Sequence, residues 1–221
     1  MSHGRLLGPT KIEGGRMWLR CRGEKERTVG KVVVVNHVTL DGVMQGPGRP
    51  DEDTRDGFEH GGWAAARNDE IMGAKVAEWM GGDHAFLFGR RSYEDMLAAW
   101  NRMGGPHKEG LNNAPKYVAS RSAATRLEWP NSILLHGDVT TAVTELKQSL
   151  GTNLVVMGSG QLIDSLLSAE VVDTFLLMIH PIVLGAGRRL FEQGIHASLR
   201  LVDSVTTTKG VLLATYESAR P

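Results

Sequence analysis

The chain has 221 residues, of which 41% are hydrophobic and 23% are charged, and its 25 basic residues equal its 25 acidic residues in number. This composition fits a globular domain with a substantial core and excludes a disordered or fibrous chain. The balanced charge gives no reason to expect nucleic acid as a partner, and no apolar run is long enough to cross a bilayer.

Residues 1 to 29 are rich in Gly, Arg and Lys and have no apolar periodicity. We expect a disordered basic extension or an overcalled start, with Met17 or a later start, ahead of a domain that covers residues 30 to 221. A basic arm for nucleic acid is the functional alternative. The segment has no signal-peptide core, and the single cysteine, Cys21, cannot form an internal disulfide, so we expect a cytoplasmic protein.

From Lys31 onward, segments typical of strands and helices alternate, which indicates an α/β domain. Residues 31–40, "KVVVVNHVTL", form a β-branched run without a polar face, which predicts a central buried strand. The turn-rich segment 41–62 is long enough to indicate a functional loop. A helix is expected at 68–80, with Asn68 as its N-cap.

The rest of the chain continues this alternation. Further strands are expected at 85–88, 115–120, 132–136, 153–158, 171–184, 199–208 and 211–219, and further helices at 92–100, 139–150 and 160–169. Residues 101–113 are expected to form a second glycine-rich loop, and "KG" joins the last two strands as a hairpin. These elements predict a mainly parallel central sheet flanked by helices, with an antiparallel C-terminal edge.

Three unusual junctions fall at the carboxyl ends of predicted strands, where open α/β sheets bind ligands: 89–92, "GRRS", 120–122, "SRS", and 158–161, "GSGQ". A helix N-terminus offers unpaired N–H groups and a partial positive charge to an anion. The glycines allow close approach and the arginines add fixed charge. Together the three junctions suit a dinucleotide with an extra phosphate.

Each junction also has an explanation that needs no ligand. Arg90 and Arg91 could be solvated, or could pair with Glu94 and Asp95. The "GSG" segment could be a tight turn alone, and Arg121 could be an ordinary surface residue.

The motifs "NHVTLDGVMQGPG", "FGRRSYE", "VASRS", "VMGSGQLI" and "HPIVLGAGRRLFE" occur in this order between about Lys31 and Ser218. In these motifs the chain resembles the dihydrofolate reductase-like superfamily, and most closely the bacterial proteins related to the C-terminal reductase domain of the bifunctional riboflavin-biosynthesis deaminase/reductase. The resemblance implies a dihydrofolate reductase-like three-layer α/β fold and an NADPH-dependent oxidoreductase.

The resemblance also implies which residues bind the cofactor. The loop after the first strand would lie by the nicotinamide, "GRRS" with "SR" would hold the pyrophosphate and the 2′-phosphate, and "GSGQL" would pass beneath the pyrophosphate. The cofactor-binding residues are then Thr39, Leu40, Gly42, Gly89, Arg90, Arg91, Ser92, Ser120, Arg121, Gly158, Ser159, Gly160, Gln161 and Leu162.

The chain departs from the resemblance in two places. In true dihydrofolate reductases an acidic residue in the first helix binds the pterin, and here Asp69 or Glu70 is only a rough positional counterpart. The zinc signature of a deaminase half, H-x-E with C-x-x-C, is absent from the sequence. The substrate is therefore expected to be a small pterin- or pyrimidine-like heterocycle.

Asp41 and His60 are the candidate catalytic residues. Asp41 follows the buried strand and could anchor the substrate near the nicotinamide, or could satisfy local backbone groups in an Asp-Gly turn. The loop with Phe58, His60 and Trp63 could close over a planar substrate, with His60 donating a proton, or could be an ordinary packed loop. His180 reads as structural, and the histidine spacing predicts no metal.

Two classes of function follow. The favoured one is an NADPH-dependent reductase that transfers a hydride to a small heterocycle, with 5-amino-6-(5-phosphoribosylamino)uracil reductase-like or dihydrofolate reductase-like activity. The alternative is a non-catalytic nucleotide-binding sensor or interaction module. A Rossmann-type dehydrogenase is disfavoured because the first strand lacks the glycine fingerprint. The apolar C-terminal hairpin makes a homodimer plausible.

Overall fold

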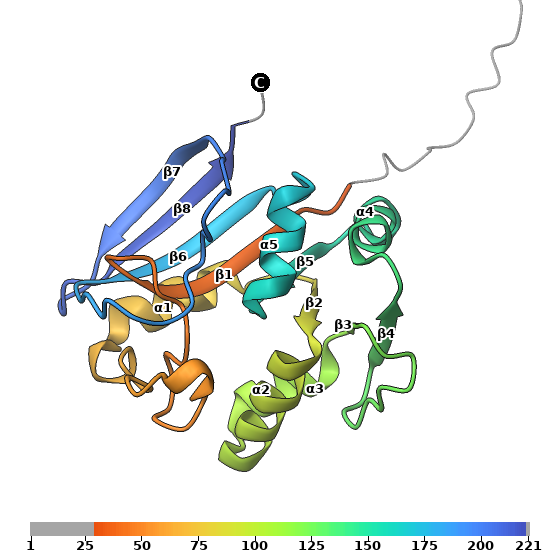
Figure 1. The fold of residues 1–221 in the computed structure, drawn as a ribbon, viewed down its shortest axis with the longest axis horizontal. Helices are drawn as coiled ribbons and strands as arrows, with labels where there is room; N and C mark the ends of the chain where they lie inside the picture. Colours follow the sequence, from red (N-terminus) through yellow and green to blue (C-terminus); the bar gives the residue numbers. More distant parts are fainter. Residues whose placement is uncertain (1–28, 220–221) are drawn as a thin grey trace, which may run out of the picture.

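The computed structural model describes residues 29–219, with the side chain of His107 left out. Within them, eight strands form one sheet in the order β4-β3-β2-β5-β1-β6-β8-β7 (Figure 1). The strands are β1 (Val32–Thr39), β2 (His84–Gly89), β3 (Lys116–Ser120), β4 (Ser132–His136), β5 (Asn153–Val156), β6 (Thr174–His180), β7 (Leu199–Thr206) and β8 (Leu212–Ser218).

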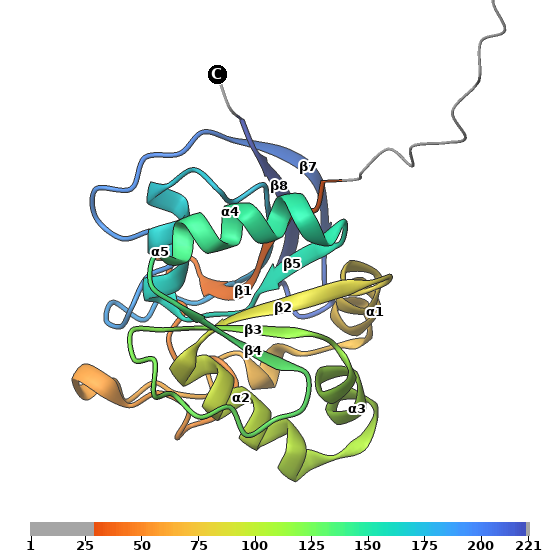
Figure 2. The ribbon, with the colours of Figure 1, turned by 90° about the vertical axis from the view of Figure 1, so that its right-hand side faces the viewer.

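The helices of the described residues cover both faces of this sheet. They are α1 (Glu70–Trp79), α2 (Arg90–Met103), α3 (Gly105–Asn113), α4 (Val139–Leu150) and α5 (Gly160–Ser168), with 3-10 turns η1 (Arg55–Gly57) and η2 (Ala65–Arg67). Figure 2 shows α4 and α5 on one side of the sheet and α1, α2 and α3 on the other. The molecule is therefore a three-layer α/β sandwich.

Alternation along the strands builds the two cores between these layers. Val34 of β1 and Leu87 of β2 pack with Leu166 of α5 on one face of the sheet. Their neighbours Val35 and Phe88 point the opposite way and join the core under α1, α2 and α3. Because both faces of β1 are covered, its β-branched run needs no polar side, as the sequence predicts.

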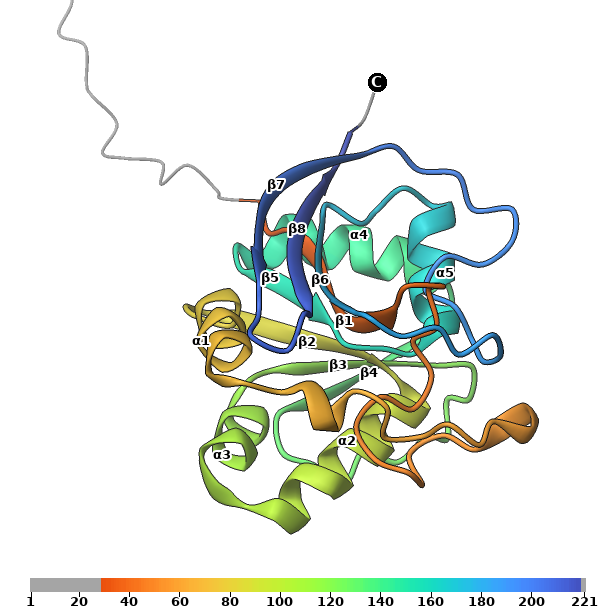
Figure 3. The ribbon, with the colours of Figure 1, turned by 90° about the vertical axis from the view of Figure 1, so that its left-hand side faces the viewer.

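The strand directions confirm the predicted sheet. Each neighbouring pair from β4 to β6 is parallel, whereas β8 runs antiparallel to both β6 and β7. The carboxyl ends of β3, β2, β5, β1 and β6 therefore meet at one edge, where the loop between β1 and α1 also lies. Figure 3 shows that loop, in orange, running past the start of α2.

The first helix begins later than predicted. Its N-cap is Asp69 and not Asn68, because the Asp69 carboxylate accepts the Met72 N–H at 2.9 Å. The same carboxylate accepts the N–H and the hydroxyl of Thr208, at 2.8 and 2.7 Å. The Met72 N–H first, and then the Thr208 hydroxyl, lower the pKa of Asp69 to about 2. Asp69 thus joins α1 to the β7–β8 turn, a long-range contact that a sequence pattern does not contain.

The glycine-rich loop expected at 101–113 is wrong, because residues 105–113 form the helix α3. Pro106 stands in the first turn, where its missing N–H costs nothing. The far end is capped from outside, since Lys116 Nζ donates to the carbonyls of Leu111, Asn112 and Ala114 at 2.5, 3.2 and 2.7 Å. This cap, supplied by the first residue of β3, helps a weakly helical sequence to form a helix here.

Several other boundaries differ from the prediction by a few residues, among them the start of α2 and both ends of β6. Helix α2 starts at Arg90 and not at residue 92, so both arginines of "GRRS" belong to its first turn. Strand β6 covers 174–180 and not 171–184. Just before this strand, the Asp173 carboxylate accepts the Val32 N–H at 2.8 Å, and the Asp173 N–H donates to the Val32 carbonyl at 2.9 Å.

No helix among residues 29–219 is both long and apolar enough to span a bilayer. The expected basic extension falls, apart from Val29, outside the described residues, so it stays a prediction.

Lys116 provides a test of how the α2–α3 region is held together. Its side chain is fully buried, and burial lowers its pKa to about 8. We expect Lys116→Met to lower the free energy of unfolding by about 1 to 3 kcal/mol, because three carbonyls lose their donor. Urea unfolding followed by circular dichroism measures this, with the exposed Lys31→Met as the control. Equal effects of the two substitutions would contradict the capping role.

Candidate active site

The turns that follow β2 and β5 interlock at the carboxyl edge of the sheet. The Gly89 N–H donates to the Gly158 carbonyl at 3.1 Å. A Cβ on Gly89 would lie 2.3 Å from Ser159 Oγ, and one on Gly158 would lie 2.8 Å from Ser92 Oγ. Gly158 also has φ +125, and the Gly158–Ser159 peptide bond is cis. Neither position has room for a side chain.

Helices α2 and α5 begin at these two turns. Their N-cap residues, Gly89 and Ser159, make no side-chain capping hydrogen bond. The N–H groups of both first turns are therefore left for a ligand or water, and both helix dipoles present their positive ends at the same place. Such an arrangement suits a negatively charged group.

The third predicted junction lies beside the first. Strand β3 pairs with β2 so that Ala119 stands opposite Gly89, which brings Ser120 and Arg121 to the same edge. Ser120 Oγ is 2.7 Å from the Thr125 hydroxyl, while Arg121 is exposed. The structure thus brings together the three junctions that the sequence singles out. Their cofactor role stays a prediction.

The two arginines of α2 differ in their surroundings. Arg90 Nη1 lies 2.9 and 3.0 Å from the two carboxylate oxygens of Glu94, which is the pairing that needs no ligand. Asp95 is paired with Arg49 of the β1–α1 loop at 2.7 Å. Arg91 is exposed and forms no ion pair with another residue in the described part of the chain. Of these two arginines, Arg91 is therefore the one whose guanidinium is available to a phosphate.

Asp41 ties the loop after β1 to the loop after β6. Its carboxylate accepts the Thr39 hydroxyl at 2.6 Å and the N–H groups of Gly185 and Leu184 at 2.8 and 3.2 Å. The Thr39 hydroxyl first, and then these N–H groups, lower the pKa of Asp41 to about 2. Asp41 thus binds backbone groups, as the structural alternative expects, but those groups belong to the distant loop after β6 and not to the Asp-Gly turn itself. An ionised Asp41 is an acceptor. Its expected catalytic role stays a prediction.

The other residues of this turn lie as an Asp-Gly turn requires. Gly42 has φ +83, and its N–H donates to the Thr39 carbonyl at 2.9 Å. Thr39 is buried, and its hydroxyl also accepts the Val43 N–H at 2.9 Å. Leu40 is 66% exposed at the mouth of the site, an unusual position for a leucine.

Phe58 and Trp63 form the core of the β1–α1 loop. Both are buried with Val43, and Trp63 Nε1 donates to the Gln45 carbonyl at 2.7 Å. They are thus packed as the structural alternative expects. His60 is exposed, and its ring meets Phe58 edge-on with centroids 5.7 Å apart. Its expected role as a proton donor stays a prediction.

The start of α5 is overlaid by two other loops. A Cβ on Gly160 would lie 3.6 Å from Arg188 Cδ and 3.7 Å from Met44 Sδ. Gln161 is exposed, whereas the Leu162 side chain is buried in the core, so only its backbone faces the turn. Arg188 and Met44 therefore limit the space above the positive end of α5.

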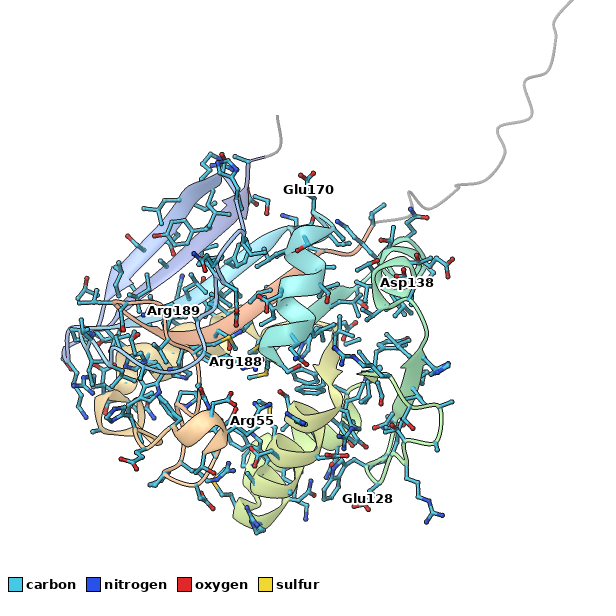
Figure 4. All side chains as sticks on the ribbon, viewed as in Figure 1. Arg55, Glu128, Asp138, Glu170, Arg188 and Arg189 are labelled. Carbon is cyan, nitrogen blue, oxygen red and sulfur yellow. The ribbon has the colours of Figure 1, made fainter. Side chains whose placement is uncertain are left out.

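Sequence reasoning assigned no role to the arginines that follow β6. Arg188 and Arg189 line a cavity of about 400 Å³ together with Arg55, which the β1–α1 loop contributes (Figure 4). Arg55 is paired with Asp53, and the Arg188 N–H donates to Gln45 Oε1 at 2.9 Å. The pair of arginines after "GAG" was the only sign of this cavity in the sequence. The residues that line it with them, such as Arg55, come from a loop about 130 residues earlier in the chain.

Sequence reasoning also missed a pair of histidines, of which His180 is fully buried and His37 is partly buried. His37 Nδ1 lies 2.9 Å from His180 Nε2, and Trp63 packs edge-on against His180 at 5.2 Å. Burial, and then the proximity of His180, lower the pKa of His37 to about 3. Burial, and then nearby Arg67, lower the pKa of His180 to about 4. Both rings are therefore neutral at physiological pH, and His180 packs as the structural reading expects.

The arrangement fits a phosphorylated dinucleotide such as NADPH. The side-chain-free turn at Gly89 and Gly158 is a cradle that a Cβ would fill, and Arg91 adds an unpaired charge beside it. The buried Asn36 Nδ2 has no partner among the described residues, and it lies two positions beyond the Val34–Val156 pair, level with the α5 turn. Residues 29–219 contain no group of three or more His, Cys, Asp or Glu side chains placed to hold a metal ion.

The histidine pair predicts an acid-sensitive fold. In the unfolded chain a histidine has a pKa near 6.5, so below that pH the unfolded state takes up protons before the folded state does. The free energy of unfolding should therefore fall as the pH drops from about 6.5 towards 4, by up to about 1.4 kcal/mol per pH unit for each ring. Urea unfolding at several pH values measures the slope. His37→Gln should make it shallower, and an unchanged slope would contradict this account.

Comparison with known proteins places the chain among reductase-related folds. It is similar to the Bacillus subtilis protein YyaP, at 30% identity over 137 residues, which cover 59% of this chain and 71% of YyaP. Among solved structures, a protein of Shewanella sp. PV-4 described as a riboflavin biosynthesis protein superposes with a TM-score of 0.63 and 19% identity, over 86% of this chain and 99% of that chain.

Dihydrofolate reductase from Enterococcus faecalis, solved with NADP(H) and RAB-propyl, superposes with a TM-score of 0.58 and 13% identity, over 87% of this chain and 98% of that chain. RibD of Acinetobacter baumannii gives a TM-score of 0.58 and 14% identity, with 87% of this chain matching 58% of that protein. These structures confirm the dihydrofolate reductase-like fold. The RibD C-terminal domain family matches residues 30–213, and the chain belongs to that family.

Proposed function

We propose that the protein is an NADPH-dependent reductase that transfers a hydride to a small heterocyclic substrate. The observation that carries this proposal is the side-chain-free contact between the Gly89 and Gly158 turns, where two uncapped helix starts face the same space. Membership of the RibD C-terminal domain family supports a reductase. The NADP(H) bound to the Enterococcus faecalis enzyme supports the choice of cofactor.

Each part of the site has a role in this proposal. The first turns of α2 and α5 bind the pyrophosphate through their N–H groups, and Arg91, with Arg121 beside it, binds the 2′-phosphate. The turn from Thr39 to Gly42 borders the nicotinamide. When bound, NADPH supplies the hydride, and the protein contributes orientation and exclusion of water.

A pyrimidine-like substrate fits this site better than a pterin. Asp69, the rough counterpart of the pterin-binding acid, is already occupied by the Met72 N–H and by Thr208. The cavity lined by Arg55, Arg188 and Arg189 also contains Asp56 and Glu192, and Arg55 and Arg189 already contact Asp53 and Asp41. Arg188, which forms no ion pair among the described residues, is the guanidinium that the cavity offers to an anionic substituent. Both observations favour 5-amino-6-(5-phosphoribosylamino)uracil reductase-like activity over dihydrofolate reductase-like activity.

The homodimer expected from the sequence remains a proposal. Strand β7 is an edge strand, and it exposes Leu201, Val202 and Val205 to 51%, 47% and 37%. A second copy of the chain would cover these side chains.

Changing the two arginines of α2 separately tests the cofactor assignment. Arg91→Ala should weaken NADPH binding by about 10- to 100-fold, because it removes a charge-assisted hydrogen bond, and should leave NADH binding almost unchanged. Arg90→Ala should weaken NADPH binding by less than about threefold, since Arg90 is already paired with Glu94. Fluorescence titration measures both, with Arg102→Ala at the far end of α2 as the control. Binding of neither nucleotide by the unaltered protein would contradict the proposal.

A glycine substitution tests the cradle itself. Gly89→Ala places a Cβ against Ser159, so we expect at least a tenfold loss of NADPH affinity and a lower thermal midpoint. Gly110→Ala is the matched control, because nothing lies within 4 Å of a Cβ at that helical position. Calorimetric titration and thermal unfolding give the two quantities. Undiminished binding by Gly89→Ala would show that the phosphates lie elsewhere.

A further inference from the structure

The His37–His180 pair stands at the end of the sheet where the proposed nicotinamide and substrate meet. The two residues lie on adjacent central strands, at the carboxyl ends of β1 and β6. Side chains two positions apart in a strand point to the same face of the sheet. His37 therefore shares a face with Val33 and Val35, and His180 shares it with Met178, which is the face that α1 and α2 cover. His37 is only two residues before Thr39, the start of the turn assigned to the nicotinamide.

The pair leaves one ring nitrogen without a partner in the core. His180 is 0% exposed, and its Nδ1 has no hydrogen-bond partner among the described residues. A buried N–H without an acceptor costs more than a buried acceptor without a donor. His180 Nδ1 is therefore the unprotonated nitrogen, and His180 Nε2 carries the proton that is donated to His37 Nδ1.

This tautomer fixes the state of the other ring. Since His37 Nδ1 accepts from His180, the neutral His37 must carry its proton on Nε2, which becomes an outward donor. His37 is partly exposed, whereas His180 is sealed behind Trp63. Only the His37 ring can therefore reach a ligand.

We propose that His37 Nε2–H donates a hydrogen bond to an acceptor atom on the edge of a planar ring at this end of the sheet, and that His180 is the positioning residue that fixes the tautomer. This inference rests on the proposed reductase function. A hydrogen bond to a carbonyl or imine group polarises it without transferring a proton, because a neutral imidazole is too weak an acid to release one. The proton that completes the reduction then comes from water.

Nitrogen-15 NMR of the histidine side chains tests this inference, since protonated and unprotonated ring nitrogens resonate far apart. At pH 7.5 we expect both rings to be neutral with the proton on Nε2. Assignment uses His37→Gln and His180→Gln, or through-bond correlations in the unaltered protein if those variants do not fold. His84 is the control ring, because it begins β2 and so lies at the edge of the sheet away from the proposed site.

Three additions identify the acceptor. The compound 2′,5′-ADP, which has no nicotinamide, should leave the His37 Nε2 signal unchanged. A shift with NADPH identifies the carboxamide of the cofactor, and a further shift when 5,6-diaminouracil is added identifies the substrate ring. Backbone amide shifts at 158–162 report cofactor binding independently.

The outcomes separate this inference from the function on which it rests. Amide shifts at 158–162 without any change at His37 would overturn the inference alone. A proton on His37 Nδ1, or a charged His180, would also overturn it. If NADPH shifts neither set of signals, the proposed function and the inference both fail.

Discussion

The site depends on a contact that leaves no room for a side chain. Gly89 ends β2 and Gly158 lies in the turn after the neighbouring parallel strand β5, and the hydrogen bond between their backbones holds two helix starts together. A β-carbon at either position would meet the hydroxyl of Ser159 or Ser92 at a distance that real contacts do not reach. The missing side chains therefore allow two positive helix ends to converge, which is the electrostatic basis of the proposed cofactor site.

The opposite wall of the site is organised by buried polar side chains. Gln45 is 5% exposed, and its side chain donates to the carbonyls of Asp53 and Arg55 in its own loop and accepts the Arg188 N–H of the loop after β6. Its backbone carbonyl accepts from Trp63 Nε1. Asp41 links the loops after β1 and β6 in the same way. These bonds hold Arg188 over the start of α5, so the loops that border the proposed substrate are tied to the glycine turns rather than free.

The sequence predicts the features that arise from local patterns and misses those that depend on contacts between distant residues. The buried strands, α4 and the three junctions follow from apolar periodicity and glycine placement, and the structure contains each of them, although β5 and β6 are shorter than predicted. The cap of α3 comes from Lys116, within five residues of the carbonyls that it binds, so distance does not explain why the sequence predicted a loop there. The cap of α1 depends on Thr208, a partner that no local window contains. The His37–His180 pair was missed for the same reason, because the two residues are 143 positions apart.

Backbone hydrogen exchange with and without NADPH tests the central claim most directly. If the two helix starts bind the cofactor phosphates, NADPH will slow exchange at the first-turn amides of α2 and α5, around residues 91–92 and 160–162, with little change in α4. Protection confined to other segments, or no protection at saturating NADPH, would contradict the account.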